Sequence, residues 1–139
     1  MSVLSTRRPS IMASELRVNT LKDASGNNSV ATSFVAGGSA KVWINFNGTG
    51  TIATVDSLNV SGLTDNGTGN YTVSYSSNMG SAGYALGNSG GDTGVMFECW
   101  LGATYGLPTT SNTGLGTGYD GPVSTDLSVV TSMIMGDLA

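Results

Sequence analysis

The alternation of apolar and polar residues between Lys41 and Tyr75 constrains the fold of this chain most strongly. The apolar members are Val42, Ile44 and Phe46 in a first run and Tyr71, Val73 and Tyr75 in a second. A period of two over several residues is typical of strands with one buried face. Asn47-Gly48 and Asp65-Asn66-Gly67 lie between such runs and supply residues that tolerate positive φ, as tight reversals require. The segment is therefore predicted to be antiparallel β-sheet.

Further runs with a strand pattern follow along the chain, and no helical periodicity is visible after Lys41. Strands are predicted near residues 41–47, 51–62, 70–76, 82–87, 94–103 and 123–136. Several short strands separated by turn signals favour a sandwich over an open sheet. We therefore expect an all-β, jelly-roll-like β-sandwich body over residues 41–139.

Residues 1–40 have a different composition and are predicted to form an extended arm. Leu16, Val18 and Leu21 are their only ordered apolar pattern, and the flexible Gly37-Gly38-Ser39 follows. An extended strand with one apolar side does not fold alone, but it can pair with neighbouring copies or lie on another protein. The arm is thus expected to be an attachment segment.

Three segments resemble proteins of one functional class. The run KVWINFNGTGTIATVDSLNVSGLTDNGTGNYTVSY resembles a module of virion appendage proteins of tailed bacteriophages, notably marine ones. SELRVNTLKDASGNNSV is similar to the opening of such proteins, and VVTSMIMGDLA to their closing strand. The resemblance implies a fibre-type protein of the virion, and it implies a homotrimer.

Two functions remain open at this point. One is a short tail fibre or fibre tip that is attached by its N-terminal arm and contacts the host surface. The other is a capsid or tail decoration or cement protein with a purely structural role. The absence of a repetitive shaft from this sequence argues against a long fibre, whereas the fibre-type opening and ending favour an appendage.

The distribution of charge supports attachment through the arm. Charged residues make up 10% of the chain, against about 25% in an average domain, and so little charge is consistent with burial against copies of itself. Residues 1–41 hold five bases and two acids, a net charge of +3, whereas residues 42–139 hold seven acids and no base. We expect Arg7, Arg8 and Arg17 to bind another virion protein. The acidic body disfavours nucleic acid as a partner.

Few residues in this chain suit catalysis. It has no histidine and a single cysteine, Cys99, which excludes Ser-His-Asp and Cys-His arrangements and zinc sites built on His or Cys. Two carboxylates across a cleft can hydrolyse a glycoside, but the acids of this chain are scattered one per loop. Residues 65–70 cluster oxygen ligands, yet their order favours a turn over a calcium loop. We expect no enzyme activity, no cofactor and no metal. The sequence also lacks an apolar run of 18 residues, so it predicts no membrane-spanning helix.

Residues 102–121 form the longest stretch without a strand pattern, and we expect them to be the exposed, partner-facing end. Gly114 to Gly118 lacks the spacing of a dinucleotide fingerprint and is read as a flexible loop. Tyr105, Tyr119 and Asp120 are the candidate receptor residues, because two rings can stack on a host surface glycan while a carboxylate accepts its hydroxyls. Trp100 and Tyr84 are assigned to packing.

Overall fold

The computed structural model describes residues 17–92, 95–96, 98–100, 106–119 and 123–139. Its contacts divide the chain into two compact units, Met1–Thr32 and Ser33–Ala139. We describe each unit by itself. The division falls eight residues before the boundary at residue 40 that the sequence suggested.

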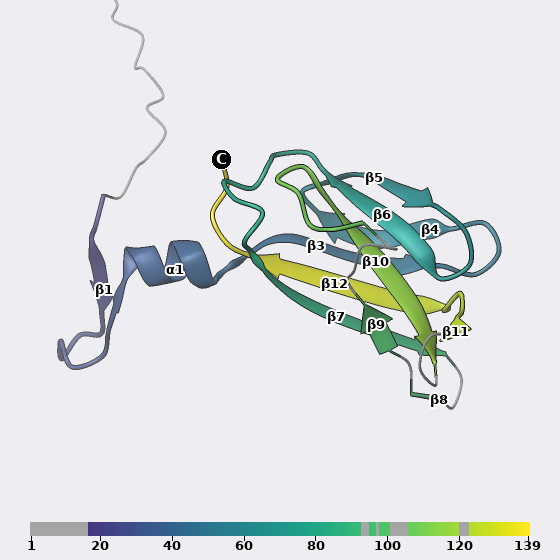
Figure 1. Ribbon diagram of the computed structural model, residues 1–139. Helices are drawn as coiled ribbons and strands as arrows, with labels where there is room; N and C mark the ends of the chain where they lie inside the picture. Colours follow the sequence, from purple (N-terminus) through teal and green to yellow (C-terminus); the bar gives the residue numbers. More distant parts are fainter. Residues whose placement is uncertain (1–16, 93–94, 97, 101–105, 120–122) are drawn as a thin grey trace, which may run out of the picture. The chain divides into compact units, whose positions relative to one another are not determined.

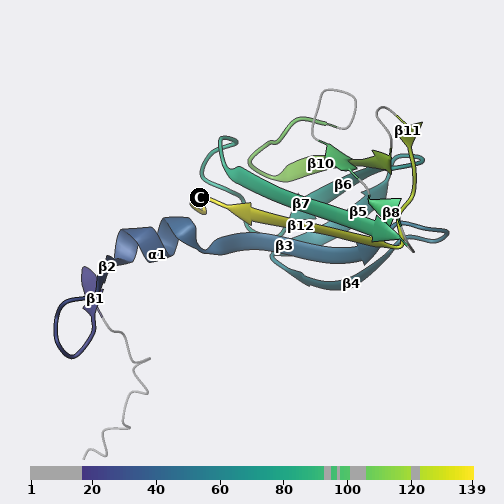
Figure 2. The same ribbon diagram turned by 90° about the horizontal axis from the view of Figure 1, so that it is seen from below.

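The larger unit contains two antiparallel sheets that pack against each other (Figures 1 and 2). Sheet I has the order β4 (Ala53–Leu58), β3 (Ala40–Asn47), β12 (Val129–Met135), β7 (Ala85–Asp92) and β8 (Val95–Met96). Sheet II has the order β5 (Val60–Asp65), β6 (Asn70–Tyr75), β10 (Asn112–Tyr119) and β11 (Val123–Ser124), with β9 (Glu98–Trp100) also paired to β10. The predicted all-β sandwich is confirmed. The first and last long strands, β3 and β12, are neighbours in sheet I.

The core lies between the two sheets and is built by the alternation seen in the sequence. β3 and β6 each bury every second side chain. Among the described residues of the larger unit, the buried apolar ones are Val42, Ile44, Phe46, Tyr71, Val73, Tyr75, Met79, Leu115, Leu127, Val130 and Ile134. The rings of Phe46 and Tyr71 meet edge to face across the sheets, with centroids 5.0 Å apart. Burial of each large apolar side chain stabilises the fold by about 1.5–3 kcal/mol.

The prediction of a flexible loop at Gly114–Gly118 is wrong. These residues belong to β10, an inner strand of sheet II that pairs with β6 from Asn112 to Gly116. Thr113, Leu115 and Thr117 are buried, and a glycine follows each of them on the opposite side of the strand. The opposite face is also covered, since a Cβ on Gly106 would lie 3.6 Å from the Gly114 Cα. The glycines here allow close packing, so part of the predicted 102–121 loop is a strand of the sandwich.

The predicted strand at 51–62 is two strands, because the chain leaves sheet I at Asn59 and enters sheet II. Asn59 has a φ of 57°, which asparagine tolerates better than most residues. Its side chain holds the bend in place by accepting a hydrogen bond from the Ser77 amide at 2.7 Å and donating one to the Ser77 carbonyl at 3.0 Å. The predicted strand at 123–136 is likewise divided, into β11 and β12.

The smaller unit contains a hairpin of two short strands, β1 (Thr20–Lys22) and β2 (Ser29–Ala31). Asp23 organises its turn: one carboxylate oxygen accepts hydrogen bonds from the Ser25 hydroxyl and the Asn27 amide, and the other from the Asn28 side chain. The bond from Ser25 is the main cause that lowers the pKa of Asp23. A short helix that the sequence pattern did not indicate, α1 (Thr32–Gly38), follows the hairpin in the chain, and all of it after Thr32 belongs to the larger unit.

Candidate functional site

Most of the residues singled out from the sequence lie outside the described part of the chain. Arg7, Arg8, Tyr105 and Asp120 are among the residues that are not described. Tyr119 ends β10, where its backbone pairs with Val123, but its side chain is also outside the description. Arg17 is exposed. The side chains of the proposed receptor site therefore lie outside the described residues, and the assignment of that site stays a prediction.

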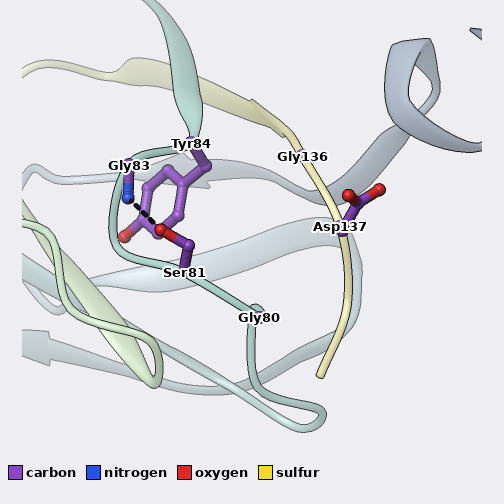
Figure 3. Close-up of a pocket in the computed structure, with 6 residues that line it drawn as sticks. All are labelled: Gly80, Ser81, Gly83, Tyr84, Gly136 and Asp137. Atoms are coloured by element: carbon purple, nitrogen blue, oxygen red, sulfur yellow. Dashed lines mark hydrogen bonds between the residues drawn. The ribbon is translucent and has the colours of Figure 1, made fainter.

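A pocket of about 410 Å³ lies at one end of the sandwich, between the segment that connects β6 to β7 and the end of β12 (Figure 3). Glycines form half of its described lining, at Gly80, Gly83 and Gly136. The Ser81 hydroxyl accepts a hydrogen bond from the Gly83 amide at 3.0 Å. Asp137 supplies the one carboxylate among the described lining residues. A single carboxylate is one fewer than glycoside hydrolysis requires.

Tyr84 forms a wall of this pocket, but its hydroxyl is hydrogen-bonded to other residues of the protein. It lies 2.7 Å from the Tyr75 hydroxyl and donates to the carbonyls of Thr109 and Asn112, at 3.0 and 3.2 Å. The ring packs against the core, so the assignment of Tyr84 to packing is confirmed. Burial, with a smaller contribution from Tyr84, raises the pKa of Tyr75 well above its ordinary value. The hydrogen bond between Tyr75 and Tyr84 thus ties this wall of the pocket to the core.

The opposite end of the sandwich is closed by a tyrosine and an aspartate. The Tyr71 hydroxyl donates to the Asp126 carboxylate at 2.7 Å, and the Gly69 amide donates to the same oxygen at 2.7 Å. Burial and this carboxylate raise the pKa of Tyr71 far above its ordinary value. The Gly48 amide donates to the Leu127 carbonyl at 2.8 Å and ties a third segment to this end.

The segments with turn signals in the sequence form turns at this end of the sandwich. Asp65 accepts a hydrogen bond from the Gly67 amide at 2.8 Å, which confirms that residues 65–70 form a turn. The two NGTG segments also end alike, because Gly50 and Gly69 both have a positive φ, of 64° and 62°.

A second hollow, of about 340 Å³, lies on the outer face of sheet I and is lined by residues of β3, β12 and β7. These three strands are neighbours in the sheet (Figure 2). Its outward-facing lining residues form two rows across the strands, Trp43–Met133–Gly87 and Asn45–Thr131–Ser89. We call this the Trp43 groove. Gly87 lacks a side chain, and a Cβ built on it would meet nothing within 4 Å. The groove is thus open above β7 and bounded by the indole of Trp43 on β3.

Sequence reasoning missed this groove, although it contained a usable signal. Trp43 falls between the buried Val42 and Ile44, so the period of two places it on the outer face of its strand. A tryptophan on the outer face of a strand is an uncommon use of the largest apolar side chain. What the sequence did not indicate is that Gly87 and Ser89 lie two strands away in the same rows.

The described part of the chain holds no group of three or more His, Cys, Asp or Glu residues that could bind a metal ion. None of the helices in the described ranges is long and apolar enough to cross a membrane. Comparisons of the chain with protein-family models, with curated proteins and with solved structures found no match.

Proposed function

We propose that this chain is a structural protein of a tailed-bacteriophage virion, a short tail fibre or fibre-tip component. Residues 1–40 attach it to other virion proteins, and the sandwich body contacts the host surface. The protein acts as a homotrimer and has no catalytic role. A capsid or tail decoration protein is the alternative, and it differs in that the body contacts only other virion proteins.

The observation that carries the proposal is that residues 17–39 fold into a hairpin and a helix without burying a single side chain. Phe34 on α1 is 77% exposed, and Leu21 and Val30 on the hairpin are also exposed. A two-stranded hairpin and a seven-residue helix are each marginal in water unless they pack against something. A partner surface that covers these apolar side chains would stabilise both elements, as an attachment segment requires.

Charge supports the same assignment. Every base in the sequence lies within residues 1–41, while the body from residue 42 onward carries only acids. A basic segment is attracted to an acidic partner, and the acidic body is kept away from it. Attachment through the N-terminal residues therefore leaves the body directed outward.

Incorporation into virions tests the proposal. Phe34→Ser should reduce the amount of this protein in purified virions at least about tenfold, because an aromatic anchor that becomes buried at an interface contributes about 2 kcal/mol or more. Val55→Ser is the matched control, since Val55 is 68% exposed on β4 of the body. Quantitative mass spectrometry of the particles measures both variants.

Equal incorporation of the Phe34 and Val55 variants would remove the support for an N-terminal anchor. Light scattering of the purified chain tests the trimer, which a stable monomer at micromolar concentration contradicts. Labelling of intact particles separates the two functions: density at the tail tip favours the fibre, and density spread over the capsid favours decoration.

A further inference from the structure

We propose that the Trp43 groove is a binding site for an uncharged sugar ring, which places host recognition on the outer face of sheet I. This deepens the function proposed above and rests on it for the biological source of the sugar. It differs from the expected site at Tyr105, Tyr119 and Asp120, because it lies on the sheet face rather than in the loops.

The groove combines an apolar wall with unused polar groups. Trp43 and Met133 are adjacent in one row, and Asn45 and Ser89 lie in the next. Among the described residues, nothing accepts a hydrogen bond from the Trp43 indole N–H, and the side chains of Asn45 and Ser89 likewise have no hydrogen-bond partner. Tryptophan presents an apolar body with a polar tip. A pyranose ring has the matching character, with an apolar face of C–H groups and hydroxyls around its edge.

The absence of charged side chains from the groove lining restricts the class of sugar that can bind. None of the described lining residues is ionisable in the physiological range. The row Asn45–Thr131–Ser89 continues on β4 with Asp56, which pairs with Asn45 and carries the closest carboxylate in that row. The body has no base after Lys41. The base nearest to Trp43 along β3 is Lys41, on the same outer face, but its ammonium donates hydrogen bonds to the carbonyls of Ala36 and Ser39. The described lining itself holds no base that could pair with an anionic sugar or a phosphate, and therefore an uncharged sugar is favoured.

Gly87 provides a separate reason to expect a ligand. A glycine in the interior of a strand weakens it, and such a glycine often marks a close approach by a ligand or another backbone. At Gly87 nothing in the body makes that approach, since no described atom lies within 4 Å of a built Cβ. Its φ is also not in the left-handed region, so its backbone conformation does not demand glycine. The open volume of about 340 Å³ is at the lower end of the range for small-ligand sites.

A second copy of the chain is the competing occupant, because Leu58 extends the apolar row beyond Trp43. Polar residues, however, form the whole of the neighbouring row, and the core of an interface between identical subunits is more apolar than that. The mixed lining fits a hydroxyl-rich ligand better than a subunit interface.

Nuclear magnetic resonance of the full chain tests the proposal. The probes are methyl β-D-glucopyranoside, methyl β-D-galactopyranoside, methyl α-D-mannopyranoside and N-acetylglucosamine, with N-acetylneuraminic acid as the charged comparison. At least one uncharged probe should shift the Trp43 indole signal, assigned with Trp43→Phe, with a Kd near 1 mM, which corresponds to about −4 kcal/mol. The charged sugar should bind at least about tenfold more weakly.

The structure offers a matched pair of groove variants. Gly87→Leu fills the groove and should weaken binding at least about tenfold, while Gly91→Leu should change it less than about twofold. Gly91 lies on the same face of β7, it also has nothing within 4 Å of a built Cβ, and it is outside the groove lining. Thermal unfolding confirms that both variants fold. Asn45→Ala, which removes an unpartnered amide, gives an independent measurement if Gly87→Leu does not fold.

The proposal is overturned if no uncharged probe shifts the indole signal, or if Gly87→Leu binds as well as the unmodified chain. If Gly87→Leu instead changes the oligomeric state in light scattering and no sugar binds, the face is an interface between copies. These measurements need no virions, so their failure is distinct from a failure of incorporation by the Phe34 variant.

Discussion

The two ends of the sandwich each contain a buried tyrosine from β6, but they are built differently. At the first end the Tyr71 hydroxyl binds a carboxylate, and glycines allow three backbone segments to approach it closely. At the second end the Tyr75 hydroxyl binds another tyrosine, Tyr84, beside a pocket of about 410 Å³. The first end is closed by packing, whereas the second leaves open space beside its tyrosines.

This difference shows that glycine has two separate uses in one small fold. A Cβ at Gly48 would lie 2.8 Å from the Tyr71 ring carbon that bears the hydroxyl, and one at Gly69 would lie 2.7 Å from the Thr125 amide nitrogen. A Cβ at Gly83, which lines the pocket, would be no closer than 3.4 Å to the Ser81 hydroxyl. Glycine is required at positions 48 and 69 of the closed end, whereas Gly83 at the open end is replaceable.

The largest expected effect is at Gly48. Gly48→Ala should reduce the free energy of unfolding by about 3 kcal/mol, because the added methyl group overlaps Tyr71 and faces the Leu127 carbonyl at 3.1 Å. Gly83→Ala is the matched control at the open end and should change stability by less than about 0.5 kcal/mol. Urea unfolding measures both. Similar losses for the two variants would mean that the ends do not differ in packing.

An intermediate effect is expected from removing the tyrosine hydroxyls. Tyr71→Phe should reduce stability by about 2 kcal/mol, since it deletes a hydrogen bond to a charged group. Tyr84→Phe removes the hydroxyl shared by Tyr75, Thr109 and Asn112. It should cost about 1 kcal/mol, because these partners are neutral and lie next to a pocket that water can enter. Urea midpoints of the two variants give the comparison. A larger loss for Tyr84→Phe would contradict the ranking of the two ends.

The last effect, which is absent near neutral pH, is a change in the slope of stability with pH. The pKa values of Tyr71 and Tyr75 are both raised in the folded protein, chiefly by burial. Their contribution is therefore fully present below the pKa of an unfolded tyrosine, about 10, and is lost as the pH rises above it, by at most about 1.4 kcal/mol per pH unit for each ring. Urea midpoints between about pH 9 and about pH 11.5 measure this loss. Tyr71→Phe should make the decline shallower, and an unchanged slope would show that Tyr71 ionises equally in both states.

The sequence pattern predicted the strands whose buried faces carry large apolar residues. β3 and β6 begin and end within a residue of their predicted positions, because their alternation is unambiguous. β10 was missed, since glycine is a strong loop signal and its inward residues include two threonines. Helix α1 was missed because its seven residues include two glycines and it buries no side chain.

The sequence predicted the kind of residues that a candidate binding site would combine, but it did not predict where in the fold the Trp43 groove would lie. An aromatic ring beside neutral polar groups was expected at Tyr105 and Tyr119, in residues whose side chains lie outside the described structure. The Trp43 groove shows that combination on a sheet face instead. It depends on β12 lying between β3 and β7, an order in which strands far apart in the chain become neighbours.

By itself, the sequence determined that this chain forms strands with one apolar side and that its positive charge lies in the first 41 residues, because both are properties of local order along the chain. Only the tertiary structure decided that Asp126 would meet Tyr71, 55 positions away, and that Gly87 would open a space beside Trp43. Such contacts form only when the strands assemble in a particular order and the two sheets pack against each other. The most stable strand order depends on the summed burial of many side chains, which no short segment of the sequence encodes.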